Sequence, residues 1–140
     1  MPSIPPVPLF PRPIRALLGP LGTSAAGMSR QQAFIEVISQ NIANAETTRT
    51  ADGTPYRRQI ARAVETDSGE LRTEIVEDTR PGRAVYDPGH PDADETGYVR
   101  YPNVEIATET IDLMIARRMH EANATVFQAA KAMLRRALEI

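Results

Sequence analysis

The chain has 140 residues with 16 basic and 18 acidic side chains, so its formal net charge is only −2. This balance excludes the broad basic surface that proteins need to bind nucleic acids. Cysteine is absent, which excludes disulfides, thiol catalysis and zinc–thiolate sites. No stretch reaches the roughly 18 apolar residues of a membrane span. The short apolar run interrupted by Gly19 and Pro20 does not match a cleaved signal peptide. One domain, or one small domain with helical arms, is therefore predicted.

Residues 1–20 are predicted as a proline-rich N-terminal extension. Prolines stand at positions 2, 5, 6, 8, 11, 13 and 20. Proline fixes φ and removes a backbone donor, so this composition predicts an extended, polyproline-like segment without helix. The sequence leaves the role of the extension open.

Residues 21–45 are predicted as the N-terminal helix. Pro20 stands just before it, and Asn41-Ile42-Ala43-Asn44 ends it, because asparagine accepts the left-handed geometry that closes helices. Apolar residues recur every seven positions, with a half-turn partner among them: Leu21, Met28, Ile35, Ile38 and Ile42. A repeat of about 3.5 residues is typical of helices that supercoil around partners.

Residues 46–102 are predicted as a small β-rich insert with loops. Asp52-Gly53 is a turn signal, and we expect a hairpin around it with strands at 47–50 and 56–64. Further short strands are predicted at 71–76, 83–86 and 98–101. So few short strands do not predict a sheet that is stable on its own.

Residues 103–140 are predicted as one long helix, with Asn103 as its N-cap and no Gly or Pro inside it. Its length is about 55 Å. The apolar repeat continues along it: Ile115, Met119, Ala122, Val126, Ala129, Met133 and Ile140. This helix has more apolar surface than residues 21–45 can cover. We therefore predict an α+β fold whose two terminal helices form a coiled coil, with both apolar stripes in subunit interfaces.

No catalytic, metal or cofactor site is predicted. Asp92 and Asp94 open an acidic loop that begins like a calcium-binding EF-hand, but Thr96 and Asn103 stand where that motif needs other ligands. His90 and the helical His120 have no partner at zinc-binding or catalytic spacing. The sequence thus predicts a protein that is not an enzyme.

Several blocks, in chain order over residues 21–140, resemble the axial proteins of the bacterial flagellar rod and hook, and among them the proximal-rod family. The blocks that carry the resemblance include Asn41-Ile42-Ala43-Asn44, Tyr56-Arg57-Arg58, Gly97-Tyr98-Val99-Arg100, Tyr101-Pro102-Asn103 and Glu121-Ala122-Asn123. Two features depart from the family pattern. The N-terminal extension is longer, and His120 stands where tyrosine is expected.

The resemblance implies a structural subunit whose terminal helices form an inner, D0-like coiled-coil layer around a central channel. It implies export by the flagellar type III apparatus without a cleaved signal peptide, and assembly into the part of the basal body that spans the periplasm. The implied partners are further copies, other proximal-rod subunits, the distal-rod protein and the adaptor that joins the rod to the membrane ring. The rod would transmit torque as a drive shaft.

Two other hypotheses remain open. A helical adaptor or export chaperone would use the same apolar stripes to form discrete complexes. A small enzyme would place its site in the β-rich insert, where loss of His90, Asp92 and Asp94 together would abolish activity.

Overall fold

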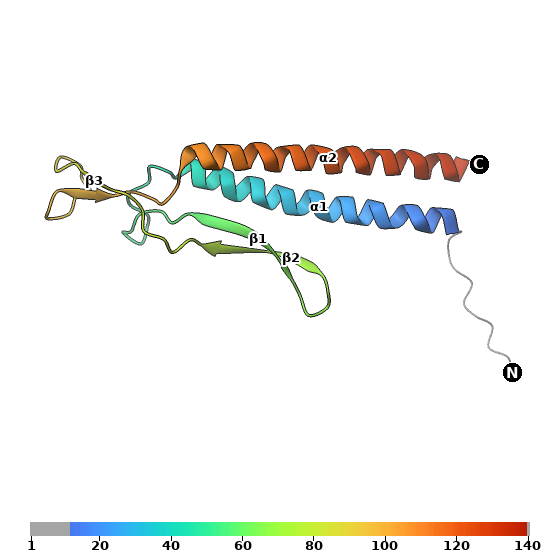
Figure 1. The fold of residues 1–140 in the computed structure, drawn as a ribbon, viewed down its shortest axis with the longest axis horizontal. Helices are drawn as coiled ribbons and strands as arrows, with labels where there is room; N and C mark the ends of the chain where they lie inside the picture. Colours follow the sequence, from blue (N-terminus) through green and yellow to red (C-terminus); the bar gives the residue numbers. More distant parts are fainter. Residues whose placement is uncertain (1–11, 140) are drawn as a thin grey trace. The chain divides into compact units, whose positions relative to one another are not determined.

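The computed structural model describes residues 12–139, and the N-terminal segment 1–11 and Ile140 lie outside the described residues. Along the chain, one long helix precedes four short strands and a second long helix follows them (Figure 1). Their order is α1 (Arg12–Ala43), β1 (Gln59–Glu65), β2 (Leu71–Glu77), β3 (Ala84–Tyr86), β4 (Tyr98–Arg100) and α2 (Ile106–Glu139). The predicted α+β class with a small strand insert between terminal helices is confirmed. None of the described helices is long and apolar enough to cross a membrane.

Helix α1 begins at Arg12, so the prediction that residues 12–20 are non-helical was wrong. Pro13 falls in the first turn, where its missing N–H has no partner in any helix. Pro20 lies inside α1 and removes one backbone hydrogen bond to Ala16. Ala16 and Pro20 are both exposed, so water can satisfy the carbonyl of Ala16. The end of α1 at Ala43, within the Asn-Ile-Ala-Asn motif, is as predicted.

The described residues divide into two compact units. The first, here called the terminal helix pair, consists of residues 12–29 of α1 and 119–139 of α2. Its most buried residues are small: Ser24, Gly27 and Ala130. Asn123 packs against Gly27, and a Cβ atom added there would lie 3.0 Å from the Asn123 amide nitrogen. Small residues thus let the two helices approach closely.

The second unit, Arg30–Arg118, is here called the central unit. Strands β1 and β2 pair antiparallel from Gln59 opposite Glu77 to Glu65 opposite Leu71, and β3 pairs antiparallel with β4. Its buried apolar residues are Val37, Ala45, Val99 and Ala116. The C-terminal end of α1, the N-terminal part of α2 and strand β4 therefore all contribute to this core.

The hairpin predicted around Asp52-Gly53 was wrong. A turn does form there, with Gly53 at φ 76°, but residues 47–50 are not a strand. The true partner of β1 is β2, which follows the turn at Gly69 with φ 80°. Glycine takes this left-handed conformation without the penalty of a side chain. The strands predicted at 71–76, 83–86 and 98–101 are confirmed.

Helix α2 begins at Ile106, so the prediction that Asn103 is its N-cap was wrong. The residue before the helix is Glu105, whose carbonyl accepts the first helical bond from the N–H of Glu109. The Glu105 carboxylate accepts a 3.0 Å bond from the Thr108 hydroxyl. Asn103 instead directly follows buried Pro102, and its amide binds the backbone of Arg58, just before β1, and of Asp78, just after β2.

Candidate subunit interface

In the terminal helix pair, the inner face of α2 is a stripe of mainly small residues. The buried or half-buried positions are His120, Asn123, Ala124, Phe127, Ala130, Leu134 and Ala137. Their spacing of three and four residues places them on one side of a helix. Asn123 against Gly27 identifies this side as the one that packs on α1. We call it the inner stripe.

The stripe predicted from the sequence lies on a different side of α2. Met119, Val126 and Met133 are 50%, 51% and 58% exposed, and Ala122 and Ala129 are also exposed. Each of these residues stands one position before a member of the inner stripe. We call them the outer stripe. It contacts neither α1 nor any other described part deeply enough to be buried.

In the central unit, the first turns of α2 also expose large apolar side chains. Ile111, Met114 and Ile115 are 58%, 62% and 54% exposed. By contrast, Leu21, Met28, Ile35, Ile38 and Ile42, the predicted stripe of α1, are all half-buried. The remaining predicted interface residue, Ile140, lies outside the described residues. The two predicted stripes therefore differ: that of α1 is partly used within the chain, and that of α2 is exposed.

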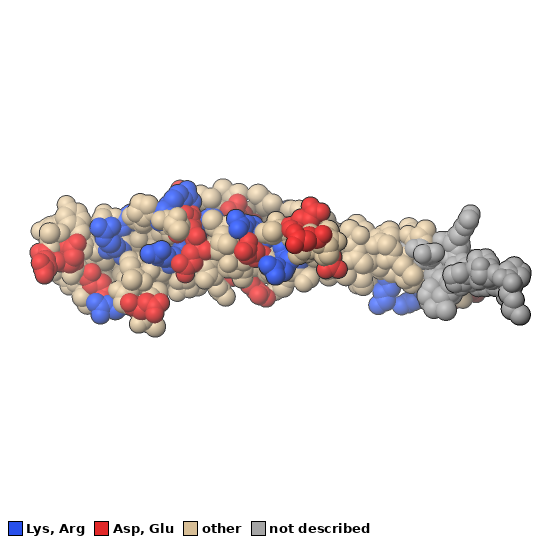
Figure 2. Space-filling view, turned by 90° about the horizontal axis from the view of Figure 1, so that it is seen from below, with Lys and Arg blue, Asp and Glu red and all other residues tan. Residues whose placement is uncertain are grey.

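Helix α1 carries no charged side chain between Arg15 and Arg30. In Figure 2 the surface that borders the grey residues is accordingly mostly uncharged, apart from one basic cluster. The charged side chains in this view gather mainly over the other part, which includes the strands. This uncharged stretch of α1 exposes Leu18, at 42%, and so favours contact with another apolar surface over contact with water.

A buried polar cluster holds the central unit together, with Asn41 at its middle. The Asn41 side chain is 1% exposed. Its amide nitrogen donates to the Gln59 carbonyl at 2.8 Å and to the Glu109 carboxylate at 3.0 Å. Its oxygen accepts from the Gln59 N–H at 2.9 Å and from the Tyr56 hydroxyl at 2.9 Å. All four bonds available to the amide are made, so Asn41 joins the end of α1 to β1 and α2.

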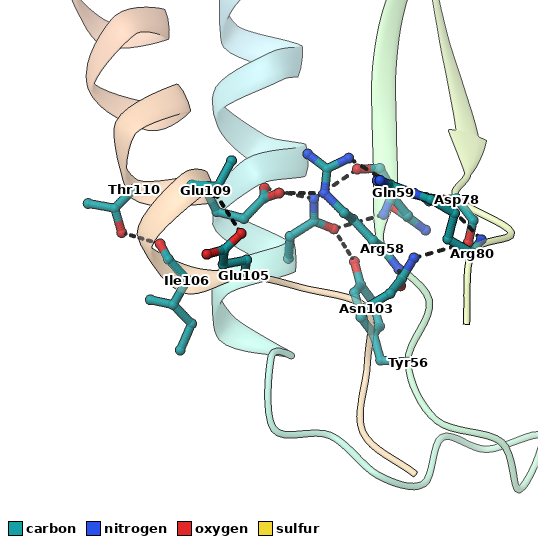
Figure 3. A network of polar contacts seen from close by, with 12 residues as sticks. Tyr56, Arg58, Gln59, Asp78, Arg80, Asn103, Glu105, Ile106, Glu109 and Thr110 are labelled. Carbon is teal, nitrogen blue, oxygen red and sulfur yellow. Dashed lines mark hydrogen bonds and ion pairs between the residues drawn. The ribbon is translucent and has the colours of Figure 1, made fainter. Parts of the chain in front are cut away.

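Arg58 extends this cluster toward β2. It lies between Glu109 on one side and Asp78 on the other (Figure 3). Glu109 is 1% exposed, and the Arg58 guanidinium neutralises it through an ion pair at 2.5 Å. The Arg58 N–H also donates to the Asn103 amide oxygen at 3.0 Å. A buried carboxylate needs this compensation, because an unpaired charge in the interior is strongly unfavourable.

Two titrating groups of the cluster are shifted. Hydrogen bonds from Arg80, with Arg80 and Arg58 charges nearby, hold the pKa of the Asp78 carboxyl at about 2. Burial raises the pKa of the Tyr56 phenol above its ordinary value of 10.0, and the Glu109 charge adds to this. Tyr56 therefore stays a hydroxyl donor to Asn41 at neutral pH.

The residues of the family-like blocks occupy distinct places. Asn41, Tyr56, Arg58 and Asn103 meet in the polar cluster. Asn44 binds the Gln40 carbonyl and the Thr47 hydroxyl just after α1, where it stabilises the helix end. Of the remaining residues, Pro102 is buried, Ile42 is half-buried, and Ala43 and Arg57 are exposed. Tyr98 lies on β4, and the Tyr101 ring stacks under Arg83.

Contacts within the acidic loop between β3 and β4, and one with Arg49, hold the loop in place. Asp92 pairs with Arg49 at 2.7 Å, and Asp94 accepts bonds from Thr96 and from the Tyr98 N–H. His90 accepts a bond from the Asp92 N–H. Among the described residues, no three acidic or histidine side chains are grouped so that they could hold a metal ion.

Sequence reasoning missed the inner stripe and the polar cluster. The inner stripe has a signal, because three of its members, Asn123, Ala130 and Ala137, also recur every seven residues. A search for large apolar residues passes over it, since alanine and asparagine contribute little hydrophobic area. The polar cluster joins residues up to 68 positions apart, such as Asn41 and Glu109, and local pattern does not reveal such a pairing.

Two family models match the chain. Residues 21–49 match "Flagella basal body rod protein", and residues 95–140 match "Flagellar basal body rod FlgEFG protein C-terminal". Among curated proteins, the flagellar basal-body rod protein FlgC of Borreliella burgdorferi is 37% identical, covering 89% of this chain and 97% of the relative. The FlgC proteins of Bacillus subtilis and Salmonella typhimurium are 35% and 32% identical, covering 86% and 89% of this chain and 95% and 98% of each relative.

The first match covers the end of α1 with the Asn41 motif, and the second covers β4 and all of α2. Both helices of the candidate interface and two of the three elements joined by Asn41 therefore lie in matched regions. The relatives extend the likeness over the strands between them. The chain belongs to the FlgC family of flagellar basal-body rod proteins.

Proposed function

We propose that this chain is a structural subunit of the flagellar basal-body rod and that the outer stripe of α2 is a surface through which it assembles. The family supplies the setting, because its members are named as rod proteins. The exposed outer stripe beside an already paired inner stripe is the observation that carries the proposal.

The physical argument is that the outer stripe is too apolar to remain in water in an assembled protein. Burying a large apolar side chain contributes about 1.5–3 kcal/mol, and Met119, Val126 and Met133 each leave half or more of their surface exposed. The repeat every seven residues suits a neighbouring helix, whose side chains enter the gaps between these residues. In the assembly, the terminal helices would form the D0-like coiled-coil layer of an open helical array, as repeated head-to-tail contacts produce.

The same arrangement explains a rod that transmits torque. Twisting a bundle of long helices displaces many close-packed side chains together, and such packing has little compliance. The proposed partners are further copies, other proximal-rod proteins, the distal-rod protein and the rod-to-ring adaptor. We further propose export through the type III apparatus without signal cleavage, into the section of the rod that spans the periplasm.

An adaptor or export chaperone would use the outer stripe differently, in a discrete complex outside the rod. Site-specific cross-linking in intact basal bodies distinguishes the two. Because the chain has no native cysteine, a single introduced cysteine is its only cross-linking site. Cysteine replaces Met133 on the outer stripe, and the matched control replaces its neighbour Leu134 on the inner stripe. We expect Met133→Cys to cross-link to neighbouring subunits, and Leu134→Cys to remain unlinked between subunits.

If Met133→Cys is unlinked in purified rods, or if both variants link equally, the outer stripe is not an assembly surface. If the protein is absent from basal bodies and linked only to a soluble partner, the adaptor hypothesis replaces the rod function.

A further inference from the structure

The β3–β4 hairpin exposes an aromatic surface that the proposed function does not use. Tyr86 and Tyr98 are directly opposite in the antiparallel pair, so they share one side of the hairpin. They are 63% and 44% exposed, and their ring centroids lie 5.3 Å apart in an edge-to-face arrangement. On the other side, Val99 is fully buried. The hairpin is therefore anchored by one side and presents tyrosines on the other.

Pro88 and Gly97 extend this surface. A Cβ atom added to Gly97 would lie 2.8 Å from the Tyr86 ring and 3.2 Å from Pro88. Gly97 has φ 83°, so glycine is favoured there both by the backbone and by the ring that lies over it. We call the exposed side chains of Tyr86, Pro88 and Tyr98 the tyrosine face. Neither tyrosine hydroxyl makes a hydrogen bond within residues 12–139, so both are free to donate to a ligand.

The N-terminal segment carries a matching pattern. Pro2, Pro5, Pro8 and Pro11 recur every third residue. A polyproline II helix has three residues per turn, so these four prolines would form one continuous ridge in that conformation. Ile4, Val7 and Phe10 would form a second, apolar ridge beside it. Polyproline II carbonyls have no internal hydrogen bonds, and exposed aromatic surfaces with hydroxyl donors recognise such ridges.

Charge is complementary as well. Arg12 and Arg15 directly follow the proline repeat. The loop between β3 and β4 contains Asp87 and Glu95, neither of which forms an ion pair within the described residues. A basic residue beside a proline repeat adds affinity where the aromatic surface has an acidic border.

We propose that the proline-rich segment 1–11 of one copy binds the tyrosine face of a second copy. The length of the chain favours a second copy over the same one. Eleven residues of polyproline II reach about 34 Å. The 32 residues of α1 that separate the segment from the insert extend over about 48 Å of helix. A segment from a neighbouring subunit is free of this restriction, and the contact would link successive subunits independently of the outer stripe.

The test uses the full-length protein in two forms. One carries Ser3→Cys with a nitroxide spin label, and the other is ¹⁵N-labelled and unmodified. In a mixture, we expect paramagnetic broadening of the amides of Val85, Tyr86 and Tyr98, while those of the β1–β2 hairpin stay sharp. Two results in the mixture would each overturn the proposal: broadening on α2 instead, or no broadening at concentrations of about 1 mM. A third would be broadening that appears in a chain carrying both labels but not in the mixture.

A matched pair of variants in segment 1–11 tests which prolines make the contact, without changing the folded part. Pro8→Ala removes a ridge proline, whereas Pro6→Ala removes a proline outside the ridge. Both lose similar polyproline propensity, so only a specific contact separates them. We expect Pro8→Ala to weaken the intermolecular broadening several-fold more than Pro6→Ala does. Equal effects would show that the segment does not bind through this ridge.

A second pair tests the receiving surface. Tyr86→Ala removes the most exposed ring and is expected to weaken binding about tenfold or more. Leu71→Ala, which removes a similarly exposed apolar side chain from β2, is the control and should leave binding unchanged. If both variants bind the labelled segment alike, the tyrosine face is not its site. Rod assembly through the outer stripe is measured separately, so either proposal can fail alone.

Discussion

The terminal helix pair and the central unit are stabilised by opposite means. In the central unit, four apolar residues and a fully bonded Asn41 form a core that closes within one chain. In the described part of the terminal helix pair, Ala130 is the one apolar residue that is nearly excluded from water. There, Met119, Val126 and Met133 leave half or more of their surface exposed.

We infer from this difference that the terminal helix pair is the part that depends on partners. Ordering a residue costs about 1–2 kcal/mol of backbone entropy, which apolar burial must offset. The central unit meets this cost from its own contacts, whereas the terminal helix pair leaves Met119, Val126 and Met133 half exposed in the single chain. We infer that the terminal helix pair opens readily in the free subunit and becomes ordered in the rod.

The largest effect on the central unit is expected from Asn41→Asp. The new carboxylate would lie against the Glu109 carboxylate and could not donate to it or to the Gln59 carbonyl. We expect a loss of about 3–5 kcal/mol in the free energy of unfolding, because a buried charge is left without a partner. Urea titration followed at β1 amides measures it. Asn44→Asp, which affects a less buried asparagine, should cost far less, and equal losses would refute the role of the cluster.

The next effect separates the two sides of α2 with adjacent alanines. Ala130→Asp places a charge on the inner stripe and should lower the free energy of opening of the terminal helix pair by about 2 kcal/mol or more. Ala129→Asp places the same charge on the outer stripe and should leave that free energy within about 0.5 kcal/mol. Hydrogen exchange in the free subunit measures both. Incorporation of Ala129→Asp into rods at the native level would contradict the assembly role of the outer stripe.

A smaller effect appears only in acid. The pKa of Asp78 is about 2 in the folded chain, below the ordinary carboxyl value of 3.8, so its pairing stabilises the fold above the ordinary pKa. That contribution is lost as the pH falls from about 4 toward 2. Asp78→Asn should lower stability at neutral pH and flatten the pH dependence of urea unfolding in this window. If Asp78→Asn keeps the native pH dependence of urea unfolding, other carboxylates cause that dependence.

The smallest effect compares two glycines of α1. Gly22 has open space around it, so Gly22→Ala should stabilise the helix by about 0.5–1 kcal/mol through helix propensity. Gly27→Ala gains the same propensity but presses on the Asn123 amide, and should gain less or destabilise. Circular dichroism thermal melts compare the two. Equal gains would mean that the close approach at Gly27 does not constrain the helix pair.

Much of the fold could be predicted from the sequence. Seven-residue apolar repeats identified both helices, and turn residues bounded three of the four strands. The start of α1 could not be predicted, because Pro13 and Pro20 lower helix propensity. Pro13 stands in the first turn, where a missing N–H costs little, and Pro20 is exposed to water. The hairpin partner of β1 was missed because Asp52-Gly53 and Asp67-Ser68-Gly69 are both good turns, and only pairing across the strands decides between them.

The exposed stripe of α2 could be predicted in part, and its role as a subunit interface stays a prediction. The outer stripe was found from its large side chains, but its exposure in the single chain became visible only because the inner stripe, one residue later, packs on α1. Asn103 fitted the pattern of an N-cap, yet its amide binds the Arg58 N–H and the Asp78 carbonyl instead. Long-range polar partners of this kind compete with local capping, and the local sequence does not reveal them.

Hydrogen exchange of the whole chain, measured both as the free subunit and in purified basal bodies, tests the dependence on partners most directly. In the free subunit, we expect amides of α2 near Val126 and Met133 to exchange much faster than those of β4 in the central unit. In basal bodies, both regions should be protected. Strong protection of the α2 amides in the free subunit, or no gain of protection on assembly, would contradict the central claim that the terminal helix pair is completed by neighbouring subunits.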